Sequence, residues 1–391
     1  MTLGAVEIAR RLGTPPPTPE QVAVIEAPLE PLLVVAGAGS GKTETMTARV
    51  VHLVANGLVE RDRVLGLTFT RKAAGELSDR VRRRLRALDL ALGRGGREAG
   101  GALVAPTIAT YNSYAAGIVA EHALRLGVEP SARLVGEAGR WQIAHDVVEH
   151  WATDLDVDLA PSTVTDAVLS LAGALAEHMV QPDAVRDFVR EWVGTVESLP
   201  SGGPRMPTPV RQVRDALRLR ARLMDLVEEF AARKRKGDLV DFADQVALAA
   251  RLARQVPDVG QAERSRYAVV LLDEYQDTSV AQLTLLRHLF GDCADEGVGH
   301  PVTAVGDPHQ SIYGWRGASA GGLERFPVQF PRRDGAARPP ARVLALSTSW
   351  RNDRAVLDAA NVVAAPLREA VSARDHLRLP LLGPRRLAGD G

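Results

Sequence analysis

The sequence predicts an α/β protein in which helices cover a parallel sheet and an all-helical segment interrupts the chain. Short apolar runs alternate with helical patterns before residue 111 and again after residue 236. A glycine-rich turn joins the first apolar run to the first long helical pattern. In between, residues 111–236 carry apolar side chains at helical spacing and lack strand-like runs. Alternating strands and helices are typical of a parallel sheet with helices on both faces.

Short apolar runs are the predicted strands of this sheet, because they are long enough for buried strands and too short for core helices. They cover residues 32–35, 64–69, 107–110, 267–272, 302–305 and 342–346. Helical patterns fill the intervals. One covers residues 20–26, one runs from the glycine-rich turn to residue 55 with Gly57 as its stop, and one covers residues 72–88.

The composition limits the classes of function. Of 391 residues, 46% are hydrophobic and 25% are charged, which is ordinary for a globular protein. Lys+Arg and Asp+Glu both number 48, so any role with nucleic acid has to rest on local sites. The single cysteine, Cys293, excludes an intramolecular disulfide and a cysteine-based metal cluster, and it fits a reducing, cytoplasmic setting. We expect no signal peptide and no membrane span.

The glycine-rich turn has the pattern of a phosphate-binding loop. Its residues are Ala36, Gly37, Ala38, Gly39, Ser40, Gly41, Lys42 and Thr43, and only the first departs from G-x-x-x-x-G-K-[ST], by one methyl group. Glycines allow backbone N–H groups to turn toward phosphate oxygens, and the helix N-terminus that follows adds partial positive charge. Lys42 is predicted to bind the β- and γ-phosphates of ATP, and Thr43 to bind Mg²⁺. The alternative is a strand-to-helix turn without a ligand.

Two carboxylates, Asp273 and Glu274, directly follow the apolar run that ends at Leu272. Carboxylates at the end of a buried strand are costly unless they bind something, and this edge of a parallel sheet is where ligands bind. Asp273 is the predicted Mg²⁺ partner, and Glu274 is predicted to orient and deprotonate the attacking water. The alternative is that both carboxylates cap the next helix. Together with the glycine-rich loop, the pair predicts ATP hydrolysis.

Four segments in chain order resemble the UvrD/Rep family of superfamily 1 DNA helicases. They are Ala36 to Thr43, Thr68-Phe-Thr-Arg-Lys-Ala-Ala74, Asp273-Glu-Tyr-Gln-Asp-Thr278 and Gly306-Asp-Pro-His-Gln-Ser-Ile-Tyr-Gly-Trp-Arg-Gly-Ala318. Within the family, the chain is similar to actinobacterial AdnB-like, RecB-type helicase–nuclease subunits. The resemblance implies 3′→5′ translocation on single-stranded DNA, driven by ATP with Mg²⁺, in DNA repair or recombination.

The resemblance also implies the domain organisation. A RecA-like ATP-binding domain is expected over residues 19–110 and 237–340, with a helical insertion over 111–236. Residues 1–18 are expected to be a leader, and 341–391 the truncated beginning of a second RecA-like domain.

Matching to the family motifs gives further site residues. Gln21 matches the glutamine that reads the adenine edge, and Trp350 stands where an aromatic residue packs on adenine. Gln310 and Arg351 match the residues that sense or reach the γ-phosphate. The positions that contact DNA in the family match Phe69, Tyr313, Trp315 and Arg316. Aromatics are only 4% of the chain, yet several fall in these motifs, and stacking on a ring is worth ~1–3 kcal/mol per base whatever the sequence.

Two family features are missing, a Thr-x-His-x-x-Lys-Gly block and a second-domain arginine, and no nuclease motif is found. We therefore expect the chain to be the front part of a longer polypeptide, or a truncated gene product. Its expected partners are single-stranded DNA, the second motor domain on a longer chain, and a helicase–nuclease partner subunit. Two other classes of function stay open. One is a P-loop ATPase that acts on a non-DNA partner, although no Leu-Ser-Gly-Gly-Gln signature is present. The other is a nucleotide-binding subunit with impaired catalysis.

Overall fold

The computed structural model shows two compact units. One comprises Met1–Ala115 with Ala250–Gly391, and the other Ala116–Ala249. The structure describes residues 2–93, 104–129, 132–153, 155, 159–199, 206–312, 314, 318, 321–372 and 380–384.

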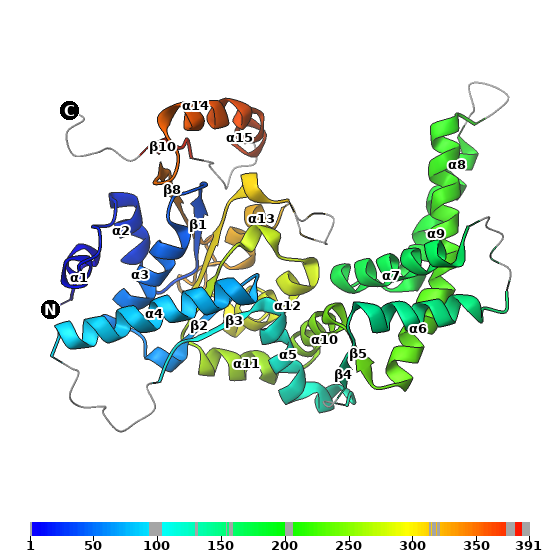
Figure 1. Ribbon diagram of the computed structural model, residues 1–391, viewed down its shortest axis with the longest axis horizontal. Coiled ribbons are helices and arrows are strands. Elements are labelled where there is room, and N and C mark those ends of the chain that lie inside the picture. The colour runs from blue at the N-terminus through cyan, green and yellow to red at the C-terminus, as the bar shows by residue number, and fades with distance from the viewer. Residues whose placement is uncertain are drawn as a thin grey trace. The chain divides into compact units, whose positions relative to one another are not determined.

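A six-stranded parallel sheet forms the core of the first unit (Figure 1). Its strand order is β3-β2-β6-β7-β1-β8, and every neighbouring pair is parallel. The strands are β1 (Leu32–Ala36), β2 (Val64–Thr68), β3 (Thr107–Thr110), β6 (Val269–Leu272), β7 (Val302–Gly306) and β8 (Arg342–Leu346). All residues of β1, β2, β6 and β7 are buried, which explains their continuous apolar sequences. The predicted α/β class with a parallel sheet is confirmed.

Helices and short 3₁₀ turns connect the strands. The helices are α1 (Ala5–Arg11), α2 (Pro19–Ile25), α3 (Lys42–Ala55), α4 (Arg71–Ala91), α11 (Pro257–Arg266), α12 (Val280–Phe290) and α13 (Gly322–Gln329). Helices α5 (Tyr111–His122) and α10 (Phe242–Gln255) contain the two unit boundaries. The 3₁₀ turns are η1 (Arg61–Arg63), η2 (Ala123–Leu126), η3 (Tyr275–Asp277), η4 (Asp295–Gly297) and η5 (Pro308–Gln310). Helix α3 ends at Ala55, and Gly57 follows with φ +65°, as the glycine stop predicts.

The predicted leader, residues 1–18, contains a helix that the sequence did not reveal. Helix α1 buries Ala5, Ile8 and Ala9, and Ile8 belongs to the main hydrophobic core. The backbone N–H of Ala5 donates to Glu26 Oε1 over 2.7 Å. A helix of seven residues shows few periods of its apolar pattern, so it is stabilised by packing rather than by a sequence signal.

Strand β8 belongs to the first sheet, although residues 341–391 were expected to begin a second domain. It pairs in parallel with β1, from Leu32 opposite Arg342 to Ala36 opposite Leu346. A separate two-stranded parallel sheet starts just after it, formed by β9 (Thr348–Ser349) and β10 (Gly383–Pro384). Between these strands lie α14 (Arg354–Val363) and α15 (Ala365–Ser372). The change from one sheet to the other therefore falls near residue 347.

The second unit is helical, and its bounds, residues 116–249, lie somewhat later than the expected insertion of 111–236. Its helices are α6 (Glu137–Glu149), α7 (Pro161–His178), α8 (Pro182–Ser198) and α9 (Thr208–Lys236), drawn in green in Figure 1. They enclose a core that includes Val168, Met224 and Phe230. The short strands β4 (Arg133–Leu134) and β5 (Leu239–Val240) also pair in this unit. Within the described residues, no helix has the length and apolar character needed to cross a membrane.

Candidate nucleotide site at the sheet edge

The glycine-rich loop lies between the carboxyl end of β1 and the start of α3. Gly39 has φ +75° and Gly41 has φ +80°, values that glycine adopts readily because it has no Cβ. Gly41 is the N-cap of α3, so Lys42 is the first residue of a 14-residue helix. The free N–H groups and the dipole of this helix favour an anion at its start. Ala36, the departure from the strict pattern, is fully buried in the core, where its methyl group packs with other apolar side chains.

The segments that carry Ser349 and Leu382 pack against this loop and leave no space for a side chain at Gly39 or Gly37. A Cβ on Gly39 would lie 2.8 Å from Ser349 Oγ, and one on Gly37 would lie 2.0 Å from the side chain of Leu382. The N–H of Trp350 donates to the carbonyl of Gly39 over 2.9 Å. The segment that carries Trp350 therefore lies directly beside the loop.

The acidic pair lies across from Lys42 at the same sheet edge. Lys42 Nζ is 3.8 Å from Glu274 Oε2, and the Glu274 side chain is 34% exposed, so water can reach it. Asp273 is buried, and this burial, followed by the charge of Glu274, raises the pKa of its carboxyl to about 6. Glu274 has φ +50°, a left-handed conformation that is uncommon outside glycine and that clusters at functional sites.

Gln276, which the sequence did not single out, connects the acidic pair to the next strand. Its Nε2 donates to Glu274 Oε2 over 2.8 Å, and its Oε1 accepts from the N–H of Asp307, just after β7, over 3.0 Å. Asp307 Oδ2 in turn accepts from Gln310 Nε2 over 2.7 Å. Gln276 is 3% exposed. The sequence signal for this role was the place of Gln276 inside the family segment from Asp273 to Thr278.

Gln21 is tied to the glycine-rich loop from helix α2. Its Oε1 accepts from the N–H of Thr18 in a capping box, and its Nε2 donates to the carbonyl of Ser40 over 3.2 Å. These bonds fix the amide while leaving one N–H and one acceptor position for a base edge. Glu20 Oε2 accepts from the N–H of Ser347 over 2.8 Å. Helix α2 thus contacts both the loop and the start of the segment that carries Trp350.

A buried arginine, Arg49 of α3, holds the end of α2. It is fully buried, and its Nη1 donates to the carbonyls of Val24 and Ala27 over 2.9 and 2.8 Å. Its Nε donates to Thr303 Oγ1 over 3.2 Å. Burial lowers the pKa of this guanidinium to about 10, so it stays charged at neutral pH. The helix of Gln21 is therefore attached to the helix of Lys42 by a charged group.

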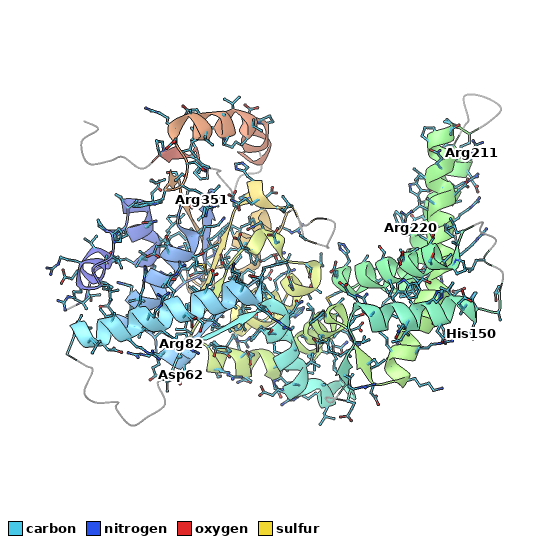
Figure 2. All side chains as sticks on the ribbon, viewed as in Figure 1. Asp62, Arg82, His150, Arg211, Arg220 and Arg351 are labelled. Atoms are coloured by element: carbon cyan, nitrogen blue, oxygen red, sulfur yellow. The ribbon has the colours of Figure 1, made fainter. Side chains whose placement is uncertain are left out.

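The remaining predicted residues lie around this edge or outside the described part of the chain. Arg351, labelled in Figure 2, is exposed after β9. A Cβ on Gly39 would lie 3.0 Å from the Cβ of Arg351. Thr43 is half-buried in the first turn of α3. Phe69 is half-buried directly after β2. Tyr313, Trp315 and Arg316 fall outside the residues that the structure describes.

The residues present fit a magnesium ion that shares its coordination with phosphate oxygens. Among the described residues, no group of three or more His, Cys, Asp or Glu side chains could hold a metal ion. Mg²⁺ in phosphate-transfer sites is commonly held by one or two protein ligands together with substrate phosphates. The hydroxyl of Ser40 and Oδ1 of Asp277 are buried here without a hydrogen-bond partner. Thr43 and Asp273 stay the predicted ligands of such an ion.

The chain is similar in sequence to known proteins. A family model described as the UvrD/REP helicase N-terminal domain matches residues 17–331. The ATP-dependent DNA helicase UvrD2 of Mycobacterium tuberculosis is 33% identical over 363 residues, which are 92% of this chain and 45% of that protein. The ATP-dependent DNA helicase PcrA of Staphylococcus aureus is 26% identical over 344 residues, which are 88% of this chain and 39% of that protein. The chain spans less than half the length of these relatives.

Proposed function

The chain belongs to the UvrD/Rep family of helicases, and on that premise we propose that it is the ATP-hydrolysing part of a motor that moves 3′→5′ along single-stranded DNA. The observation that carries the proposal is the 3.8 Å approach of Lys42 Nζ to Glu274 Oε2. At one edge of the sheet, a lysine that can bind phosphate therefore lies beside a carboxylate that water can reach. DNA repair or recombination is the proposed setting, and an AdnB-like helicase–nuclease assembly remains a prediction.

In the proposed reaction, Glu274 accepts a proton from a water molecule whose oxygen attacks the γ-phosphorus of ATP. The bond from that phosphorus to the bridging oxygen breaks, which releases ADP and phosphate. Lys42 and the N-terminus of α3 bind the phosphate oxygens, and Gln310 and Arg351 reach the γ-phosphate. When bound, magnesium neutralises phosphate charge, and Thr43 and Asp273 would hold it.

We assign base recognition and DNA binding to residues that match the family motifs. Gln21 reads the adenine edge through the free half of its amide, and Trp350 packs on the ring. Phe69 and Trp315 stack on DNA bases, while Tyr313 and Arg316 add further contacts. Aromatic stacking of this kind tolerates any base sequence, as a translocating motor requires.

The test is the rate of ATP hydrolysis with and without an oligo-dT strand. We expect hydrolysis that the strand accelerates in the parent chain, and no turnover in Glu274→Gln, which keeps the shape of the side chain and removes the base. Equal turnover in Glu274→Gln and the parent would show that the base lies elsewhere. A rate of hydrolysis that is the same with and without oligo-dT would favour an ATPase that acts on a non-DNA partner.

A further inference from the structure

Tyr111 holds the backbone of the acidic pair from a distant part of the chain. It begins α5 directly after β3 and is 4% exposed. Its hydroxyl donates a hydrogen bond to the main-chain carbonyl of Asp273 over 2.9 Å. Burial, followed by the charge of Asp273, raises the pKa of Tyr111 well above its ordinary value. The hydroxyl therefore keeps its proton and remains a donor at neutral pH.

The carbonyl that accepts this bond belongs to the peptide that joins Asp273 to Glu274. Rotation of that peptide changes the direction of the Glu274 backbone, which already has the uncommon φ of +50°. Backbone of this kind persists only where its surroundings fix it. The N–H of Asp273 is held as well, by the carbonyl of Leu67 over 2.8 Å. The Tyr111 hydroxyl thus fixes the orientation of the proposed base.

The ring of Tyr111 also meets Phe69, the half-buried aromatic residue after β2. The two ring centroids lie 6.4 Å apart and the ring planes meet at 64°, an edge-to-face arrangement. Edge-to-face pairs have a preferred geometry, so a shift of one ring changes the favoured position of the other. Tyr111 therefore contacts a residue proposed to stack on DNA and a peptide proposed to act on ATP.

Resting on the proposed function, we propose that Tyr111 is a positioning residue that couples DNA at Phe69 to the Asp273–Glu274 peptide. A base stacked on Phe69 fixes that ring and, through the edge contact, the ring of Tyr111. The hydroxyl then sets the peptide and the direction of the Glu274 side chain, close to Lys42. Single-stranded DNA and ATP must in consequence change each other's affinity by the same factor.

A second buried tyrosine of the same helix provides a matched control. Tyr114 is 8% exposed, and its hydroxyl donates to Glu263 Oε2 over 2.5 Å. Its ring meets Tyr267 instead of Phe69. Tyr114→Phe and Tyr111→Phe each delete one buried hydroxyl from α5, but only Tyr111 is bonded to the acidic pair. General weakening of the helix would affect both variants alike.

The experiment is the equilibrium affinity for mant-AMP-PNP, an ATP analogue that is not hydrolysed, with Mg²⁺, measured by fluorescence with and without saturating oligo-dT, for the chain and both variants. In the parent, we expect oligo-dT to change the dissociation constant at least about fivefold, the lower end of ordinary coupling. In Tyr111→Phe, the change should fall below about twofold, with each ligand alone binding within about threefold of the parent. Tyr114→Phe should keep the parental coupling. Hydrolysis is not required for any of these readings.

Several results would overturn the proposal. Parental coupling in Tyr111→Phe, or equal loss in Tyr114→Phe, would show that this hydroxyl has no special role. A parent that binds both ligands without coupling would refute this inference alone, whereas a parent that binds no nucleotide would refute the proposed function and this inference with it. Phe69→Leu removes the ring contact and keeps the hydroxyl bond. It is expected to lose coupling at saturating oligo-dT, so the proposal stays testable even if Tyr111→Phe does not fold.

Discussion

At the scale of single residues, we expect Gln276 to support ATP hydrolysis by holding the side chain of Glu274. It bonds to Glu274 on one side and to the N–H of Asp307 on the other. Gln276→Met keeps the length of the side chain and removes both bonds. Because a hydrogen bond to a charged group is worth roughly 1.5–3 kcal/mol, we expect kcat for ATP hydrolysis to fall about tenfold or more. The KM for ATP should change less than about threefold, since Lys42 and its loop are untouched.

A second buried glutamine separates this effect from loss of stability. Gln282 is 9% exposed and bonds to the N–H of Ser279 and to Asn112 Oδ1, away from Glu274. Gln282→Met should lower the melting temperature with little change in kcat. If both variants reduce kcat in proportion to their loss of stability, Gln276 has only a structural role.

His300 makes the stability of the first unit depend on pH. Burial, followed by the charge of Arg264, lowers the pKa of His300 to about 4, and its ring stacks on Phe290 with centroids 5.1 Å apart. The unfolded chain, where the pKa is about 6.5, takes up the proton first, so stability is complete above that pH and is lost as the pH falls toward 4. Uptake of one proton by the unfolded chain alone lowers the free energy of unfolding by about 1.4 kcal/mol for each pH unit.

The measurement is urea unfolding at pH 7 and pH 5 for the parent and for His300→Gln. The parent should lose more stability between these pH values than the variant does. Burial raises the pKa of Asp273 and of Asp277 to about 6, so these two carboxyls make the folded chain more stable as the pH falls. Both carboxyls are present in the parent and in the variant, so their contribution to stability cancels in the comparison. Equal losses would mean that His300 titrates normally.

At the scale of elements, the strands of the sheet were predictable because each is a short, mainly apolar run, although β3 has threonine at both ends and β8 begins with an arginine. The order of the strands was not, because β8 lies beside β1 while about 300 residues separate them in the chain. The apolar run 342–346 fitted a strand of the sheet, whereas the family resemblance assigned residues 341–391 to a new domain. Helix α1 escaped prediction because its seven residues show little periodicity.

Helix α2 illustrates how one buried side chain can determine the place of an element. Arg49 bonds to carbonyls at the end of α2, and Arg49→Met would remove the guanidinium donors from the carbonyls of Val24 and Ala27. Since hydrogen bonds to charged groups are worth roughly 1.5–3 kcal/mol each, we expect a loss of about 3 kcal/mol or more in the free energy of unfolding. In the fraction that folds, Gln21 should be less well held and the KM for ATP should rise. Urea unfolding that matches the parent would contradict this account of α2.

At the scale of the whole molecule, the motif residues were predictable but their connections were not. Lys42, Asp273 and Glu274 stand in recognisable patterns at strand ends, and the parallel sheet brings those ends to one edge. The bonds that support them join residues far apart in the chain: 162 residues separate Tyr111 from Asp273, and 254 separate Arg49 from Thr303. No local pattern records such pairs.

The helical unit has its own core, so damage there should leave the nucleotide site intact. Phe230 is fully buried in that core. Phe230→Ala should destabilise residues 116–249 by about 3–5 kcal/mol, the usual cost of such a truncation. The affinity for mant-ATP should stay at the parental value in folded samples at low temperature. A parallel fall in nucleotide affinity would show that the two units do not behave independently.

The central claim, that ATP binds at the sheet edge through Lys42, is tested most directly by calorimetric titration of ATP with Mg²⁺ into the parent chain and Lys42→Ala. We expect one site in the parent and an affinity at least about tenfold weaker in Lys42→Ala, because a hydrogen bond to a charged group is worth roughly 1.5–3 kcal/mol. Equal melting temperatures would show that the variant is folded. An unchanged affinity for ATP in folded Lys42→Ala would contradict the claim.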